Sequence, residues 1–222
     1  MTALSVVRDD IVACRACARL VRCRERAGAE PPRRFVGERY WGRAVPGFGD
    51  PRARVVVVGL APAANGANRT GRVFTGDRSG DWLYGALHRA GLASQAASTS
   101  ARDGMVLHGA YVTCVVRCAP PGNQPTPVER DRCLPFLARE LALLRGARAI
   151  VALGGFAWDG VLRALAATHE LPKPRPRFGH GAEVRLGARV LLGSYHVSQQ
   201  NTFTGRLTEP MLDAVFARAA AL

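Results

Sequence analysis

Three residues that can move or orient protons each follow an apolar run of the sequence: Asp77, Asn123 and His196. A carboxylate can orient or activate a water molecule, an amide both donates and accepts hydrogen bonds, and an imidazole can donate to developing negative charge. Each residue also has a structural interpretation. Asp77 could be the N-cap of the next helix, Asn123 a turn residue, and His196 a buried histidine whose hydrogen bonds are satisfied.

Four of the six cysteines have the spacing of a metal site. Cys14 and Cys17 form a C-x2-C pair at a helical end, whereas Cys118 and Cys133 flank a Pro-rich loop. Four thiolates can hold either a [4Fe-4S] cluster or Zn²⁺. The second C-x2-C pair that is usual in zinc ribbons is missing, which favours the iron–sulfur cluster. The alternative is four buried thiols that pack as small apolar side chains.

The elements that must position these residues alternate along the chain. Alternating strands and helices predict an α/β fold, here a three-layer α/β/α sandwich around a central, mostly parallel four-stranded sheet. We expect one domain over residues 1–222, with its N-terminal helix tied on by the four cysteines. Apolar runs predict the strands at 54–59, 111–117, 149–155 and 188–196, with edge segments at 182–186 and near Gly37. Helical patterns occupy 5–26, 79–91, 128–145, 156–168 and the chain from about 208.

An unusually long loop, residues 59–77, follows the first of these strands. Loops between a strand and a helix are normally short, so its length indicates a binding loop rather than a connector. The carboxyl ends of parallel strands lie along one edge of a sheet, where α/β proteins bind their ligands. We therefore expect this loop to meet the loops after residues 117 and 196 in one pocket.

Charge is the most unusual feature of the composition. The chain has 31 Lys and Arg against 17 Asp and Glu, a formal net charge of +14. This balance predicts a polyanionic partner, nucleic acid first, although a GC-rich genome also favours arginine. The first ten residues lack the apolar core of a signal peptide, and no apolar stretch approaches the ~20 residues of a membrane span. We thus expect a cytoplasmic protein with reduced cysteines and no membrane partner.

Three motifs resemble the uracil-DNA glycosylase superfamily, in particular its iron–sulfur branch, family 5 or type B. The resemblance spans roughly residues 10–222. It implies a base-excision repair enzyme, nucleoid-associated and monomeric, that hydrolyses the N-glycosidic bond of uracil and other deaminated bases in DNA. Two positions depart from the family pattern, since Asn65 replaces a His and Val197 replaces a Pro. The motifs are GLAPAANGANRTGRVFTGD at 59–77, RCAPPGNQPTP at 117–127 and HVSQQNTFTGRLT at 196–208.

The resemblance also assigns roles to individual residues. The branch holds a [4Fe-4S] cluster, and its ligands here would be Cys14, Cys17, Cys118 and Cys133. A glycosylase reads an extruded base in a pocket and must stabilise an anion on the base and a cation on the sugar. Asp77 would then activate the water, His196 would donate to the base, and Asn123 would read the base edge or help place the water. The expected base-binding residues are Phe74 as a stacking platform and Leu60, Ala61, Pro62 and Ala63 as the pocket floor.

DNA contacts are expected around the same edge of the sheet. Gln199, Gln200 and Asn201 lie on a loop that would enter the minor groove and fill the gap left by the base. Arginines near the pocket would contact phosphate. They are Arg69, Arg72 and Arg206, together with Arg78 and Arg117.

Two other functions fit parts of the sequence. A catalytically weak relative could bind or trap uracil-containing DNA on the same fold, and catalytic turnover distinguishes it from an enzyme. A metal-stabilised α/β protein could instead bind a free nucleotide or RNA, and competition between uracil-containing DNA and RNA distinguishes that. The Gly-rich loop lacks the Lys-Ser/Thr ending of a Walker motif, which disfavours nucleotide hydrolysis.

Overall fold

A six-stranded sheet forms the centre of the protein in a computed structural model that describes residues 2–166 and 171–222. The strand order is β1-β3-β2-β4-β6-β5, in which the four central strands run parallel and both edge strands run antiparallel. The α/β prediction is confirmed, but the sheet has six strands rather than four among the described residues. The strands are β1 (Phe48–Gly49), β2 (Val55–Gly59), β3 (Ala110–Cys114), β4 (Ala149–Leu153), β5 (Glu183–Leu186) and β6 (Arg189–Ser194).

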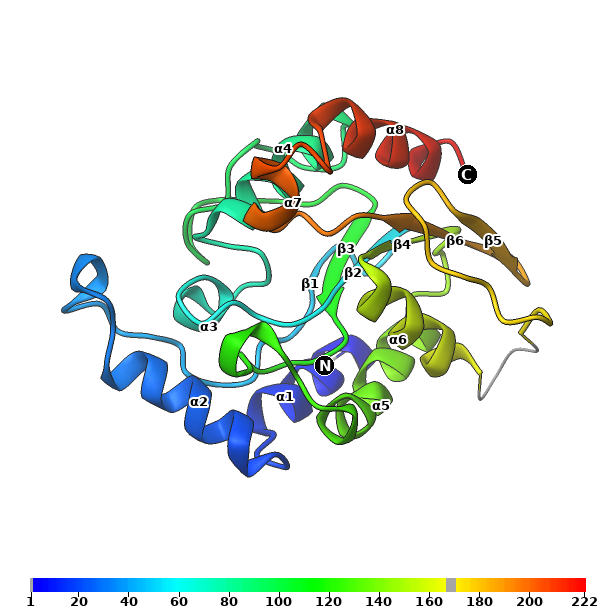
Figure 1. The fold of residues 1–222 in the computed structure, drawn as a ribbon. Helices are drawn as coiled ribbons and strands as arrows, with labels where there is room; N and C mark the ends of the chain where they lie inside the picture. The colour runs from blue at the N-terminus through cyan, green and yellow to red at the C-terminus, as the bar shows by residue number, and fades with distance from the viewer. Residues whose placement is uncertain (1, 167–170) are drawn as a thin grey trace.

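Helices cover both faces of this sheet (Figure 1). One face packs against α4 and α8, and the other packs against α1, α5 and α6. In the parts of the chain that are described, none of the helices has both the length and the apolar character needed to cross a bilayer. The helices are α1 (Ala3–Ala13), α2 (Ala18–Ala29), α3 (Ala67–Thr70), α4 (Arg78–Arg89), α5 (Pro127–Leu143), α6 (Gly155–Leu165), α7 (Gln199–Phe203) and α8 (Glu209–Ala220).

The central strands are apolar throughout because they are buried on both faces. Successive side chains of a strand point to opposite faces of the sheet. Val56 and Val58 accordingly join the core beneath α5 and α6, whereas Val55 and Val57 join the core beneath α4 and α8. This burial fixes the register of β2, and with it the point at which the chain leaves the sheet at Gly59.

Three predicted elements differ from the structure. The single helix expected at 5–26 is two helices, because Cys14 and Cys17 both have extended backbone and interrupt the helical hydrogen bonds. The edge strand expected near Gly37 lies instead at β1, where only two residues pair with β3. The helix predicted at 156–168 ends at Leu165 as described, and its last two predicted positions fall outside the described residues.

A buried ion pair links β3 to α5 on one face of the sheet. Arg117 and Glu140 are each 1% exposed, with Nη2 of Arg117 2.7 Å from Oε2 of Glu140. Thr113 donates to the same carboxylate oxygen at 2.7 Å, and the hydroxyl of Tyr111 donates to the other at 3.2 Å. The phosphate contact predicted for Arg117 is therefore wrong, since its guanidinium lies inside the protein. The Glu140 carboxylate thus accepts hydrogen bonds from three groups in a buried region, whereas Nε of Arg117 has no partner among the described residues.

We expect Glu140→Ala to lower the free energy of unfolding by about 3–5 kcal/mol, because it leaves the Arg117 guanidinium buried without a countercharge. Asp10→Ala is the matched control: it removes the carboxylate of the exposed Asp10–Arg139 pair, which should cost less than about 1 kcal/mol. Urea unfolding measures both. Equal losses for the two variants would contradict the assignment of Arg117–Glu140 as a buried ion pair that stabilises the fold.

Candidate active site

A cavity of about 450 Å³ opens at the carboxyl ends of the central strands. Its walls come from the loops after β2, β3 and β6, which are far apart in the sequence. Asp77, Asn123 and His196 all line it, so the structure brings the three polar candidates together. The expected base-binding residues line the same cavity: Leu60, Ala61, Pro62, Ala63 and Phe74.

Phe74 is held in the cavity by a close contact with the end of β2. Its ring lies so near Gly59 that a Cβ at this glycine would be 2.5 Å from Cζ of Phe74. The Phe74 backbone has φ of 51°, an uncommon conformation for a bulky side chain, and its carbonyl packs against Gly80. Backbone strain of this kind persists only where surrounding contacts enforce it. The long loop is therefore folded back onto the strand that it follows.

Asp77 serves both as a helix cap and as a wall of the cavity. Its Oδ1 accepts a hydrogen bond from the backbone N–H of Gly80 at 3.0 Å, which caps α4. Its Oδ2 faces Gly66, where an added Cβ would be only 1.8 Å away. Burial raises the pKa of Asp77 above its ordinary value, against the hydrogen bonds that stabilise its charged form. The carboxylate is thus partly desolvated and fixed in position.

His196 directly follows β6 and carries a neutral imidazole at neutral pH. Burial lowers its pKa to about 4, because a charged ring would lose its hydration. The ring centroid lies 6.4 Å from that of Phe74, and Gly154 packs against the histidine Cβ. Val197, where the family pattern has a proline, is 1% exposed and packs into the core.

The last loop contains a short helix, α7, rather than the irregular turn that was predicted. Gln200 and Asn201 line the cavity, and Nδ2 of Asn201 donates to the His196 carbonyl at 2.8 Å. Gln199 faces a neighbouring groove instead. Across the cavity, Asn123 has a positive φ of 57° in the turn after β3. A left-handed residue here directs the turn toward the cavity, a conformation that asparagine tolerates better than most residues.

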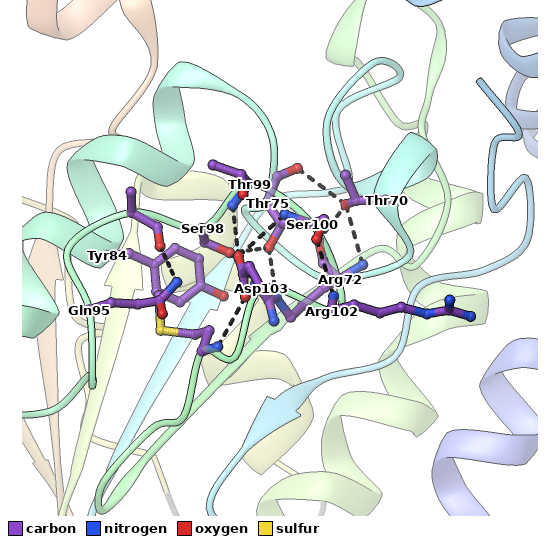
Figure 2. Close-up of polar contacts among 12 residues, drawn as sticks. Thr70, Arg72, Thr75, Tyr84, Gln95, Ser98, Thr99, Ser100, Arg102 and Asp103 are labelled. Atoms are coloured by element: carbon purple, nitrogen blue, oxygen red, sulfur yellow. Dashed lines mark hydrogen bonds and ion pairs between the residues drawn. The ribbon is translucent and has the colours of Figure 1, made fainter. Parts of the chain in front are cut away.

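Arg72 is not available to DNA, which corrects the prediction that it contacts phosphate. Its side chain is 6% exposed, and its guanidinium bonds Thr75, Ser98 and Asp103, the last at 2.6 Å (Figure 2). Burial alone would raise the pKa of Asp103, but hydrogen bonds from Arg72 and three backbone N–H groups lower it to about 2. The arginine therefore ties the long loop to residues 95–105.

The other arginines differ in their exposure. Arg69 is largely engaged within the protein: it donates to the carbonyls of Asn65 and Gly76 and pairs with Glu38 at 2.6 Å. Arg206 is exposed, with its guanidinium 4.7 Å from the ring centroid of Tyr195. The Asn65 side chain accepts from the Tyr40 hydroxyl at 2.8 Å and lies beside the neighbouring groove.

The four predicted ligand cysteines gather between α1, α2 and α5. Cys17, Cys118 and Cys133 belong to one core cluster, and Cys14 packs against it. Burial first, and then the neighbouring thiols, raise the pKa values of Cys118 and Cys133. Within residues 2–166 and 171–222, no group of three or more His, Cys, Asp and Glu side chains is arranged closely enough to hold a metal ion.

Two residues near these sites were not identified from the sequence. Arg24 is 1% exposed, its Nη1 lies 3.0 Å from Sγ of Cys118, and its Nε has no partner among the described residues. Arg24 lies four residues after Leu20 and so on the same face of α2, but nothing else in the sequence distinguishes it from an exposed arginine. Cys114 also lines the cavity, and burial raises its thiol pKa to about 12.

Comparison with known proteins identifies the family. The model of the uracil DNA glycosylase superfamily matches residues 46–220. A type-5 uracil-DNA glycosylase from Mycobacterium tuberculosis (strain CDC 1551 / Oshkosh) is 56% identical over 214 residues, which cover 96% of this chain and 79% of the relative.

Two further relatives carry the same name. The protein from Thermus thermophilus is 52% identical over 213 residues, which cover 96% of this chain and 94% of the relative. The protein from Pyrobaculum aerophilum is 46% identical over 211 residues, which cover 95% of this chain and 89% of the relative. The resemblance drawn from the three loop motifs is confirmed: the chain belongs to the uracil-DNA glycosylase superfamily and is similar, over nearly its whole length, to proteins named type-5.

Proposed function

We propose that the chain is a uracil-DNA glycosylase that hydrolyses the N-glycosidic bond of uracil, and of other deaminated bases, in DNA. The observation that carries this proposal is the single cavity lined by Phe74, Asp77, Asn123 and His196 in a member of this superfamily. A glycosylase must hold the base outside the stack while the bond breaks, and the cavity is large enough to admit a nucleobase. The relatives named as glycosylases favour turnover over a trapping relative.

The base-binding half of the site consists of an aromatic face and polar edges. The Phe74 ring provides a stacking surface, and the segment from Leu60 to Ala63 forms the floor. Asn123 both donates and accepts, so it can read the edge of a pyrimidine. The imidazole of His196 is neutral and can donate to a uracil carbonyl as negative charge develops there.

Asp77 acts on the sugar side of the bond. Its carboxylate is held by the backbone N–H of Gly80 and packed against Gly66, so it enters the reaction already oriented. It can accept a proton from the attacking water and stabilise the cationic sugar. The only lysine in the sequence, Lys173, is not among the cavity-lining residues. Without an amine nucleophile the reaction ends at the abasic site, as in a monofunctional glycosylase.

We also propose that Cys14, Cys17, Cys118 and Cys133 hold a [4Fe-4S] cluster. The buried Arg24 supports this assignment, because its guanidinium faces Cys118 and a backbone carbonyl rather than a carboxylate. A buried cation without a carboxylate countercharge fits an anionic thiolate cluster. When bound, the cluster supplies a cross-link: it would join α1 and α2 to the loop after β3 and to α5, within one domain over residues 1–222.

The remaining parts of the proposal follow from charge and family. A net charge of +14 suits DNA, and the exposed arginines Arg78 and Arg206 lie near the cavity. Three residues of α7 would fill the space that the extruded base leaves: Gln199, Gln200 and Asn201. We propose that the protein acts as a monomer associated with the nucleoid in the cytoplasm. The rival RNA-binding function requires RNA to compete with uracil-containing DNA.

We expect Asp77→Asn to reduce the single-turnover rate of uracil release by about 10²–10⁴-fold. Asparagine also caps helices well, so the free energy of unfolding should change little. Because the pKa of Asp77 is raised, the wild-type rate should fall as pH drops through that pKa, and this fall should be absent in the variant.

Asp81→Asn removes the same charge from an exposed position one turn further along α4 and serves as the control, with its rate expected within about twofold of wild type. Alkali cleavage of labelled uracil-containing DNA measures each rate. A wild-type rate of uracil release in Asp77→Asn would contradict the role given to Asp77. If the wild-type protein binds this DNA but releases no uracil, the chain is instead a trapping relative.

The His196 imidazole should stay neutral throughout the neutral range and protonate only as pH falls through about 4, below the ordinary value of 6.5. Its contribution to stability is therefore fully present above 6.5 and is lost as pH falls toward 4. An NMR titration of the ring resonances, assigned by their loss in His196→Ala, measures the midpoint. A midpoint at or above 6.5 would contradict a neutral hydrogen-bond donor.

Purified protein should be brown and contain about four iron atoms per chain. Cys118→Ser should lose most of the iron and the visible absorbance, since a thiolate ligand is removed. Cys23→Ser, which changes a cysteine outside the proposed ligand set, is the control and should retain both. Iron analysis and absorbance spectra provide the readout; a colourless protein carrying one zinc per chain would refute the cluster.

A further inference from the structure

A basic arm projects from the body of the protein beside α3 (Figure 1). We define the arm as residues 31–43, which connect α2 to the segment leading into β1. It contains one short 3₁₀ helix at Arg33–Phe35, and its chain reverses at Gly37, where φ is 88°. Nothing in the proposed chemistry of the base cavity uses this arm.

The arm carries unpaired positive charge at its surface. Its four arginines are exposed, and none forms an ion pair with a carboxylate among the described residues. Val36, at the tip, is 70% exposed. Such a surface suits a partner that is anionic and that covers the tip when bound. The four arginines are Arg33, Arg34, Arg39 and Arg43.

Several contacts fix the arm to the loop that carries the catalytic residues. The guanidinium of Arg69 lies 4.1 Å from the ring centroid of Phe35 and forms an ion pair with Glu38 at 2.6 Å. The same arginine donates to the carbonyl of Gly76, directly before Asp77. The backbone N–H of Trp41 donates to the Arg69 carbonyl at 2.9 Å. The arm is therefore prepositioned relative to Asp77.

A groove of about 770 Å³ runs between the arm and α7 and adjoins the base cavity. Arg34 and Phe35 contribute to it from the arm, and Gln199 contributes from α7. Asp77 and Asn123 line both the groove and the base cavity. The groove therefore connects the base cavity with the arm.

We propose that the arm binds the phosphodiester backbone of DNA next to the extruded nucleotide, with its arginines on the phosphates. The inference rests on the proposed function for the choice of DNA. Arginine matches phosphate in geometry and charge, and these four guanidinium groups are not neutralised by carboxylates within the described part of the chain. The Arg69 contacts hold the arm in place, so binding needs little ordering of the protein.

The test compares two variants that each remove two positive charges. One double variant, Arg33→Ala with Arg34→Ala, changes the arm. The other, Arg145→Ala with Arg148→Ala, changes exposed arginines just before β4, at the amino end of that strand and away from the cavity. Fluorescence anisotropy measures the dissociation constant for a duplex with and without one uracil over a series of salt concentrations. Single-turnover uracil release is measured at saturating enzyme.

We expect the arm variant to reduce the slope of log K against log salt by about 1.8, since each lost phosphate contact contributes about 0.9. Its affinity for both duplexes should fall about tenfold or more at low salt, and its rate of uracil release at saturation should stay within twofold. The control should keep the wild-type slope. Arg39→Ala with Arg43→Ala provides a second arm variant, expected to reduce the slope as well.

Wild-type slopes in both arm variants would overturn the proposal, as would RNA of the same sequence displacing the duplex at lower concentration. Binding to the duplex without uracil is independent of catalysis. If the wild-type protein fails to release uracil, the proposed function fails while the salt dependence still tests the arm.

Discussion

The close approach of two side chains to two glycines determines how the active site is built. The Phe74 ring packs on the backbone of Gly59, and the Asp77 carboxylate packs on Gly66. Neither contact leaves space for a Cβ, so the long loop can close on the end of β2 only with glycine at both positions. This closure places an aromatic face and a carboxylate on the same cavity.

The rest of the loop is held by polar contacts that lie behind the cavity. Arg72 ties it to residues 95–105 through Asp103 (Figure 2). Arg69 donates to the carbonyls of Asn65 and Gly76 within the loop. Buried charge-assisted hydrogen bonds of this kind restrict a segment that has little regular structure. Two arginines of this loop thus act mainly on protein geometry, which leaves the recognition of phosphate to arginines at the surface.

Long apolar runs and loop motifs made the parallel strands and the cavity predictable from the sequence. The β-branched run Val55–Val58 favoured a strand buried on both faces, and parallel strands place their following loops at one edge of the sheet. The sequence does not encode exposure so directly. Arg72 and Arg24 resemble any other arginine until the chain is folded, and only tertiary contacts bury them. The break at Cys14 interrupts a segment whose helical pattern continues on both sides, and β1 is too short to have a pattern.

The central claim is that loops after three different strands build one slot for an extruded nucleobase. A crystal structure of the protein with duplex DNA containing a non-cleavable deoxyuridine analogue tests it most directly. The account predicts that the uracil ring lies against Phe74, with Asn123 and His196 at its edge and Asp77 beside the sugar carbon. A uracil that remains stacked in the helix, or that binds away from this cavity, would contradict it.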